Sequence, residues 1–117
     1  MIKKLVAKIR HATITKASPD YKGSITIDED IMDYLGIQEW QAVDVNLKGD
    51  DQYGKPFRGT TYVIPGPRGT GCVEANGALA CHISKGDVVH INAYGYCDRD
   101  EISEQPRIIE DNLKFRM

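Results

Sequence analysis

The sequence lacks several features that would point to whole classes of protein. No apolar run approaches the roughly 20 residues that a membrane helix needs, so we expect no membrane partner. The 15 basic and 17 acidic residues give a net charge of −2, which offers no electrostatic basis for binding nucleic acid. The charges of Lys8 and Arg10 interrupt the apolar N-terminal stretch, so we expect no signal peptide.

Cysteine is also scarce. The three cysteines, Cys72, Cys81 and Cys97, are odd in number and form no C-x-x-C pair. This usage predicts reduced thiols in a cytoplasmic protein and no metal site. The glycine-rich stretch 65–71 matches neither common phosphate-binding pattern, so we expect an ordinary loop there and no phosphate cradle.

What is present is typical of one small globular domain covering residues 1–117, with 41% apolar and 27% charged residues. Short alternating stretches predict six or seven strands joined by glycine-rich turns. Asp28 can cap a short helix that Gly36 ends, and residues 78–83 could form one helical turn. We therefore expect a mainly β, compact barrel with one or two short helices, because a closed barrel leaves no exposed strand edges. The predicted strands are 5–15, 21–27, 42–47, 58–64, 72–75, 88–94 and 107–110.

Some local expectations are less regular. Residues 17–20 contain Pro19 and predict a turn, and the tail 111–117 is expected to fray. In the segment 21–27, alternation separates Ser24 and Thr26 from the isoleucines, so Ser24 need not be buried with them.

The chemistry of the chain centres on Gly23-Ser24. Gly23 has no side chain to shield its carbonyl, and the Ser24 hydroxyl can attack that carbonyl in an N-to-O acyl shift. Elimination then breaks the chain and leaves dehydroalanine, which hydrolyses to a pyruvoyl group. That ketone could form an imine with an amine substrate, although a Gly-Ser pair is far more often an ordinary turn.

The surrounding motifs, in their order, resemble those of the aspartate decarboxylase family. The motifs are Lys8 to Thr15, Tyr21 to Asp28, Arg58-Gly59-Thr60-Thr61-Tyr62, Asn76-Gly77-Ala78 and Gly86-Asp87-Val88-Val89. The resemblance runs from about Lys8 to Tyr94 and returns at 105–107.

This resemblance implies a double-psi β-barrel that cleaves itself into chains 1–23 and 24–117. It implies a covalent pyruvoyl cofactor made from Ser24, which decarboxylates L-aspartate to β-alanine for pantothenate synthesis. The family is cytoplasmic and homotetrameric, with active sites between subunits, so distant residues need not meet within one chain. Some relatives also need a separate maturation factor.

Roles for individual residues follow from the same resemblance. Arg58 and Lys8 would bind the substrate carboxylates, and Tyr62 would donate a proton during catalysis. Thr61 would hydrogen-bond the carbonyl of Gly23 during cleavage and also contact the substrate. The substrate-binding turn would be Asn76, Gly77 and Ala78, followed by Leu79.

Three features depart from the family pattern. The order Arg10-His11 is reversed, which would move each side chain to the other strand face. The connection 48–57 is longer than usual and could displace Arg58. Leu79 replaces a small residue and would narrow the pocket.

Two other functions remain open. The chain could be a barrel that binds a ligand or partner and never cleaves itself. It could also be a pyruvoyl decarboxylase for another acidic amino acid, with the selectivity set by Leu79 and the long connection.

Overall fold

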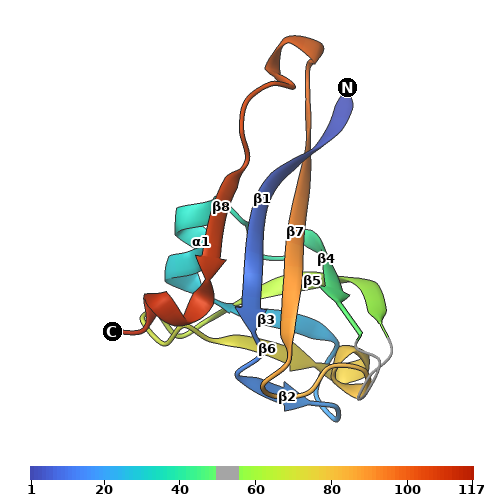
Figure 1. Cartoon of the computed structure of the whole chain (residues 1–117), viewed down its shortest axis with the longest axis vertical. Helices are drawn as coiled ribbons and strands as arrows, with labels where there is room; N and C mark the ends of the chain where they lie inside the picture. Colours follow the sequence, from blue (N-terminus) through green and yellow to red (C-terminus); the bar gives the residue numbers. More distant parts are fainter. Residues whose placement is uncertain (50–55) are drawn as a thin grey trace.

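The computed structural model describes residues 1–49 and 56–117, and this part of the chain is mainly β (Figure 1). This described part comprises eight strands, one α-helix, α1, and three short 3-10 helices. The strands are β1 Ile2–Thr13, β2 Lys16–Ser18, β3 Ser24–Asp28, β4 Ala42–Leu47, β5 Phe57–Gly66, β6 Val73–Asn76, β7 Val88–Cys97 and β8 Arg107–Asp111. The helices are α1 Glu29–Leu35, η1 Gly77–Cys81, η2 Arg99–Glu101 and η3 Asn112–Phe115.

The strands form one mixed sheet with the order β2-β6-β3-β5-β4-β7-β1-β8. Three of its pairings are parallel, β1 with β8, β2 with β6 and β3 with β5, and the others are antiparallel. Figure 1 shows β1, β7 and β8 running along the long axis, while β3, β5 and β6 cross beneath them. This mixed, strongly coiled sheet is consistent with the double-psi β-barrel, and the fold class predicted from the sequence is confirmed.

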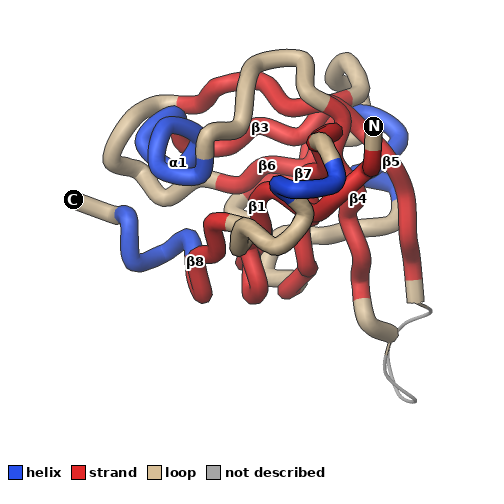
Figure 2. Tube along the Cα trace, turned by 90° about the horizontal axis from the view of Figure 1, so that it is seen from above, coloured by secondary structure: helices blue, strands red, loops and turns tan. Residues whose placement is uncertain are grey.

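Alternating apolar residues of the strands supply the core. On β1 and β7, Ala7, Ile9 and Ile91 are fully or almost fully buried, and the residues between them point to the other face of the sheet. Helix α1 adds a buried stripe to the same core and, seen from above, lies at one side of the sheet (Figure 2). Together these residues form one cluster, made of Ala7, Ile9, Ala12, Ile14, Ile25, Ile27, Ile31, Met32, Leu35, Ile37, Val43, Val45, Val63, Val73, Ala75, Leu79, Ile83, Val89, Ile91, Ala93 and Ile109.

Asp28 connects the strand that carries Ser24 to α1 and to the loop after β5. It caps α1 as predicted, accepting from the backbone N–H of Asp30 at 2.8 Å, and Gly36 ends the helix at φ 73°. The same carboxylate accepts from the N–H groups of Gly69 at 3.3 Å and Gly71 at 2.8 Å. Because Asp28 is fully buried, these bonds fix the end of β3 against two separate segments.

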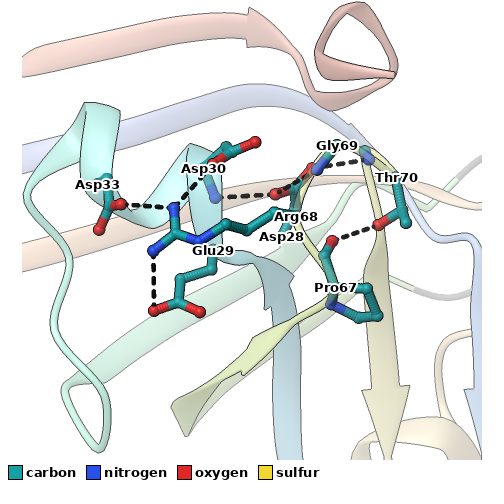
Figure 3. A network of polar contacts seen from close by, with 9 residues as sticks. Asp28, Glu29, Asp30, Asp33, Pro67, Arg68, Gly69 and Thr70 are labelled. Atoms are coloured by element: carbon teal, nitrogen blue, oxygen red, sulfur yellow. Dashed lines mark hydrogen bonds and ion pairs between the residues drawn. The ribbon is translucent and has the colours of Figure 1, made fainter. Parts of the chain in front are cut away.

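Arg68 ties the same loop to the surface of α1. Its guanidinium donates to Asp30 and Asp33, each at 2.7 Å, and lies 3.1 Å from a carboxylate oxygen of Glu29 (Figure 3). The hydrogen bond to Asp33, then that to Asp30, raises the pKa of Arg68 above its usual value. The acidic first turn of α1 is therefore neutralised by a cation from outside the helix.

Two local predictions were wrong. Lys16–Ser18 forms a short strand against β6, so the turn begins only at Pro19. The tail forms η3 and is held by the buried Asn112, which bonds to both backbone groups of Thr13 and to the carbonyl of Gly71. These partners lie far away in the sequence, so local pattern could not identify them.

The cysteines behave as isolated thiols. All three are free, with Cys72 and Cys97 buried and Cys81 exposed. Burial raises the pKa of the Cys72 thiol, which makes it a poor nucleophile. Among the described residues, no helix has both the length and the apolar character needed to cross a membrane.

Candidate active site

Ser24 is buried at the start of β3, because β5 and β6 flank this strand on both sides. Only 1% of its surface is exposed, which differs from the expectation that it need not be buried. The side chain of Asn76, directly opposite on β6, donates through Nδ2 to Ser24 Oγ at 2.9 Å. The serine hydroxyl is therefore held in one position inside the protein and is shielded from bulk water.

The backbone of Gly23 lies directly against Gly77. A side chain at Gly77 would lie 2.6 Å from the Gly23 Cα, 2.7 Å from its nitrogen and 2.9 Å from the carbonyl oxygen of Tyr21. Gly77 also has φ 64°, which favours glycine. The Asn76-Gly77 turn therefore fits against the predicted cleavage point in a way that only glycine allows.

A pocket of about 230 Å³ opens beside this contact. It brings together five residues that the sequence singled out, Gly23, Thr61, Asn76, Ala78 and Leu79. Leu79 is 8% exposed, so its side chain both lines this pocket and packs into the core. The predicted cleavage point and the predicted substrate-binding turn thus share one cavity.

Part of the pocket lining comes from residues that sequence reasoning missed. The Phe57 ring folds back over Gly59, and it stacks on His82 with ring centroids 4.6 Å apart and planes 10° apart. All three line the pocket with Thr60. The alternation of β5 could have indicated Phe57 and Gly59 as pocket residues, because they share a strand face with Thr61. His82 is brought there by η1 and had no local signal.

We predict that Gly59→Ala disrupts the stacking of Phe57 on His82. A Cβ at position 59 would lie 2.7 Å from Phe57 Cζ and 3.1 Å from Cε1, so the ring must leave its stack on His82. The free energy of unfolding should fall by about 1–3 kcal/mol, as in other overpacked sites. Denaturant unfolding measures this change, and the loss should disappear in a Phe57→Ala background. An equal loss in both backgrounds would contradict the ring clash.

Lys8, Arg58 and Tyr62 do not line this pocket. Arg58 is exposed and lies 3.6 Å from Asp44, and the Tyr62 ring stacks on Trp40 with centroids 5.3 Å apart. On β5, Arg58 and Tyr62 alternate with Phe57, Gly59 and Thr61, and so belong to the opposite face, where Thr60 also lies although it reaches the pocket.

The strand register extends this second face across the sheet. Asn46 pairs with Arg58 and His90, and Asn92 pairs with Asp44 and Lys8. Directly paired residues share a face, so these side chains form one polar surface. We call the residues Lys8, Asp44, Asn46, Arg58, His90 and Asn92 the polar sheet face.

The polar sheet face carries unused hydrogen-bonding capacity. Asn46 Oδ1, Asn92 Oδ1 and His90 Nδ1 are buried atoms without a hydrogen-bond partner in the described part of the chain. Such atoms are uncommon in proteins, since each one loses its hydration without compensation.

The structure shows where two of the departures from the family pattern lie, the reversed Arg10-His11 pair and part of the long connection. A shift in the pairing of β1 with β7 falls between Ile9 and Ala12, so simple alternation is interrupted at the reversed pair. Arg10 forms an ion pair with Glu110 at 3.2 Å, and the His11 ring packs against His90 at 5.8 Å. Within the long connection 48–57, residues 50–55 lie outside the described part of the structure.

Comparisons with known proteins identify relatives of this chain. A family model described as aspartate decarboxylase matches residues 1–116. The aspartate 1-decarboxylase of Acetivibrio thermocellus is 43% identical over 104 residues, covering 88% of this chain and 79% of that protein. The Bacillus cereus enzyme of the same name is 42% identical over 109 residues, covering 91% and 82%. That of Caldicellulosiruptor saccharolyticus is 40% identical over 119 residues, covering 98% and 88%.

Fold and site define a small mixed-sheet protein whose buried serine follows a glycine that lines a pocket. With a model match over almost its whole length and relatives at this level of identity, the chain belongs to the aspartate decarboxylase family. The prediction of a decarboxylase made from the sequence is thereby confirmed.

Proposed function

We propose that this protein decarboxylates L-aspartate to β-alanine and carbon dioxide after cleaving its own chain between Gly23 and Ser24. The observation that carries the proposal is the buried Ser24 hydroxyl, held by Asn76 beside a pocket that also contains Gly23 and Thr61. Family membership supports the reaction, and β-alanine would serve pantothenate synthesis in the cytoplasm.

The cleavage uses atoms of the chain and one water molecule. Ser24 Oγ attacks the carbonyl carbon of Gly23, the C–N bond breaks, and the hydroxyl proton ends on the nitrogen. Loss of the Ser24 Cα proton then breaks the Cβ–Oγ bond, so that Gly23 leaves as a carboxylate. Water hydrolyses the remaining dehydroalanine to the pyruvoyl group and releases ammonia.

The residues around Ser24 fit this chemistry. Asn76 donates to the oxygen on which negative charge grows as the Cβ–Oγ bond breaks, and such donors lower the barrier. The burial of Ser24 limits competing hydrolysis of the ester by bulk water. When formed, the pyruvoyl group supplies the electron sink that decarboxylation needs.

Substrate binding requires charge that this pocket lacks. Its lining holds no lysine or arginine among the described residues, whereas aspartate carries two carboxylates. Lys8 and Arg58 lie on the polar sheet face and would pair with these carboxylates, and Tyr62 Oη would donate the proton to the α-carbon.

We therefore propose that a neighbouring copy supplies Lys8, Arg58 and Tyr62, within a homotetramer. The unpaired buried atoms of Asn46, Asn92 and His90 support covering of this face by another chain. A separate maturation factor would act where the assembled protein does not cleave unaided.

Mixed assemblies test the shared site. Lys8→Ala and Ser24→Ala chains should each be inactive alone, because one lacks a carboxylate ligand and the other lacks the cleavable hydroxyl. When the two are co-expressed with different tags and purified through both, carbon dioxide release from aspartate should return. One chain then supplies Ser24 and its neighbour supplies Lys8.

Lys4→Ala provides the matched control, because Lys4 lies on the same strand and bonds to backbone carbonyls of Glu101 and Glu104. It should be active without a partner. Mixtures of Lys8→Ala and Ser24→Ala that stay inactive would show that both residues act within one chain. Carbon dioxide release from glutamate in place of aspartate would instead favour the alternative acidic substrate.

A further inference from the structure

The Asn76 amide joins two hydroxyl groups of the same strand. Its Nδ2 donates to Ser24 Oγ at 2.9 Å and to Thr26 Oγ1 at 2.9 Å. An amide nitrogen carries two hydrogens, so each hydroxyl receives one of them. Exposure of the three residues is 1%, 9% and 5% for Ser24, Thr26 and Asn76, so bulk water hardly competes for these bonds.

Only one of these two bonds is left unchanged by the proposed cleavage. Ser24 Oγ leaves with Gly23 as a carboxylate oxygen, so the first hydrogen of Asn76 loses its original acceptor. The bond to Thr26 involves no atom that changes. The released N–H belongs to a residue that lines the pocket, while the other N–H remains anchored.

Packing fixes the orientation of Thr26 itself. A Cβ at Gly66 would lie 2.8 Å from Thr26 Cγ2, which shows that the threonine methyl occupies the space a side chain there would need. Threonine is branched at Cβ, so a methyl fixed against Gly66 also fixes the direction of the hydroxyl. Thr26 therefore presents its oxygen to Asn76 as a rigid acceptor.

From this arrangement we infer that Thr26 is a positioning residue of the active site, acting through Asn76. Before cleavage it holds the amide so that the second N–H meets Ser24 Oγ. After cleavage it keeps that N–H directed at an oxygen of the bound substrate. The inference rests on the proposed function and adds a residue to which neither the comparisons nor the family resemblance gave a role.

Two substitutions of similar size distinguish the role of the Thr26 hydroxyl from the role of its methyl group. Thr26→Val keeps the branched shape and removes the acceptor, whereas Thr26→Ser keeps the acceptor and removes the methyl. Thr15→Val is the matched control, because the hydrogen bonds of Thr15 Oγ1 go to the backbone N–H and carbonyl of Val73, each at 3.1 Å, and not to Ser24 or Asn76. Each full-length chain is followed by intact mass during cleavage, and then by aspartate kinetics once cleavage is complete.

We expect Thr26→Val to slow cleavage about tenfold and to raise KM about tenfold, the size of one lost hydrogen bond. Its kcat should stay within about twofold, because the bond serves substrate binding in the mature enzyme. Thr26→Ser keeps the acceptor but loses the methyl that orients it, so both of its values should lie between those of Thr26→Val and the parent. Thr15→Val should match the parent in cleavage rate and KM, even if its thermal midpoint falls.

Three results would overturn the inference alone, given a parent that cleaves and releases carbon dioxide. They are parental values for Thr26→Val, an equal defect in Thr26→Ser, or an equal defect in Thr15→Val. A parent that neither cleaves nor decarboxylates aspartate, alone or with a maturation factor, would overturn the proposed function and this inference with it.

Discussion

Replacing Ser24 with alanine is expected to leave an intact chain that has no decarboxylase activity. The substitution removes Oγ, which both attacks Gly23 and leaves with it, so neither cleavage nor formation of the pyruvoyl group can begin. The fold should persist, because alanine fits a buried strand position and Asn76 keeps its bond to Thr26. Denaturing mass spectrometry and carbon dioxide release measure the two effects.

Ser18→Ala is a suitable control, since Ser18 ends the nearby strand β2 and has no part in the cleavage chemistry. It should cleave and turn over aspartate as the parent does. A Ser24→Ala protein that still decarboxylates aspartate would show that the reaction does not depend on a group derived from this serine.

Gly77→Ala is expected to slow cleavage by about a hundredfold or more. The added Cβ would lie 2.6 Å from the Gly23 Cα, so the backbone at the scissile bond must move. A displacement of about 1 Å at a reacting centre can cost a hundredfold in rate. The rate follows from the disappearance of the intact mass with time in freshly purified protein.

Backbone strain alone also affects Gly77, because alanine at its φ of 64° costs about 1–2 kcal/mol. Gly86→Ala isolates that effect, since Gly86 has φ 92° and a Cβ there would meet nothing within 4 Å. Both variants should lose stability, but only Gly77→Ala should lose cleavage. Equal cleavage rates in the two variants would contradict a role for the contact with Gly23.

Much of the fold could be predicted because its signals are local. The strands β4, β5 and β7 alternate clearly, and α1 is bounded by Asp28 and Gly36 as expected. The burial of Ser24 could not be predicted, because it arises from β5 and β6 flanking β3 on both sides. Strand β2 and the ordered tail depend on partners distant in sequence, which local pattern cannot reveal.

The candidate site, like the fold, could be predicted only in part. The resemblance to a family singled out Gly23, Asn76 and Leu79, and the structure brings them into one pocket. It could not identify the stack of Phe57 on His82, which depends on a glycine at position 59 and on the position of η1. The separation of Lys8 and Arg58 from this pocket is a property of strand register, which shows only once the strands are paired.

The most direct test of the account is the intact mass of the purified protein under denaturing conditions. Self-cleavage predicts two species, residues 1–23 ending at Gly23 and residues 24–117 beginning with a pyruvoyl group in place of Ser24. Borohydride with aspartate should then add the substrate to the larger species alone. A preparation that decarboxylates aspartate while every chain keeps the full 13.1 kDa mass would contradict the claim that Ser24 is the source of the catalytic group.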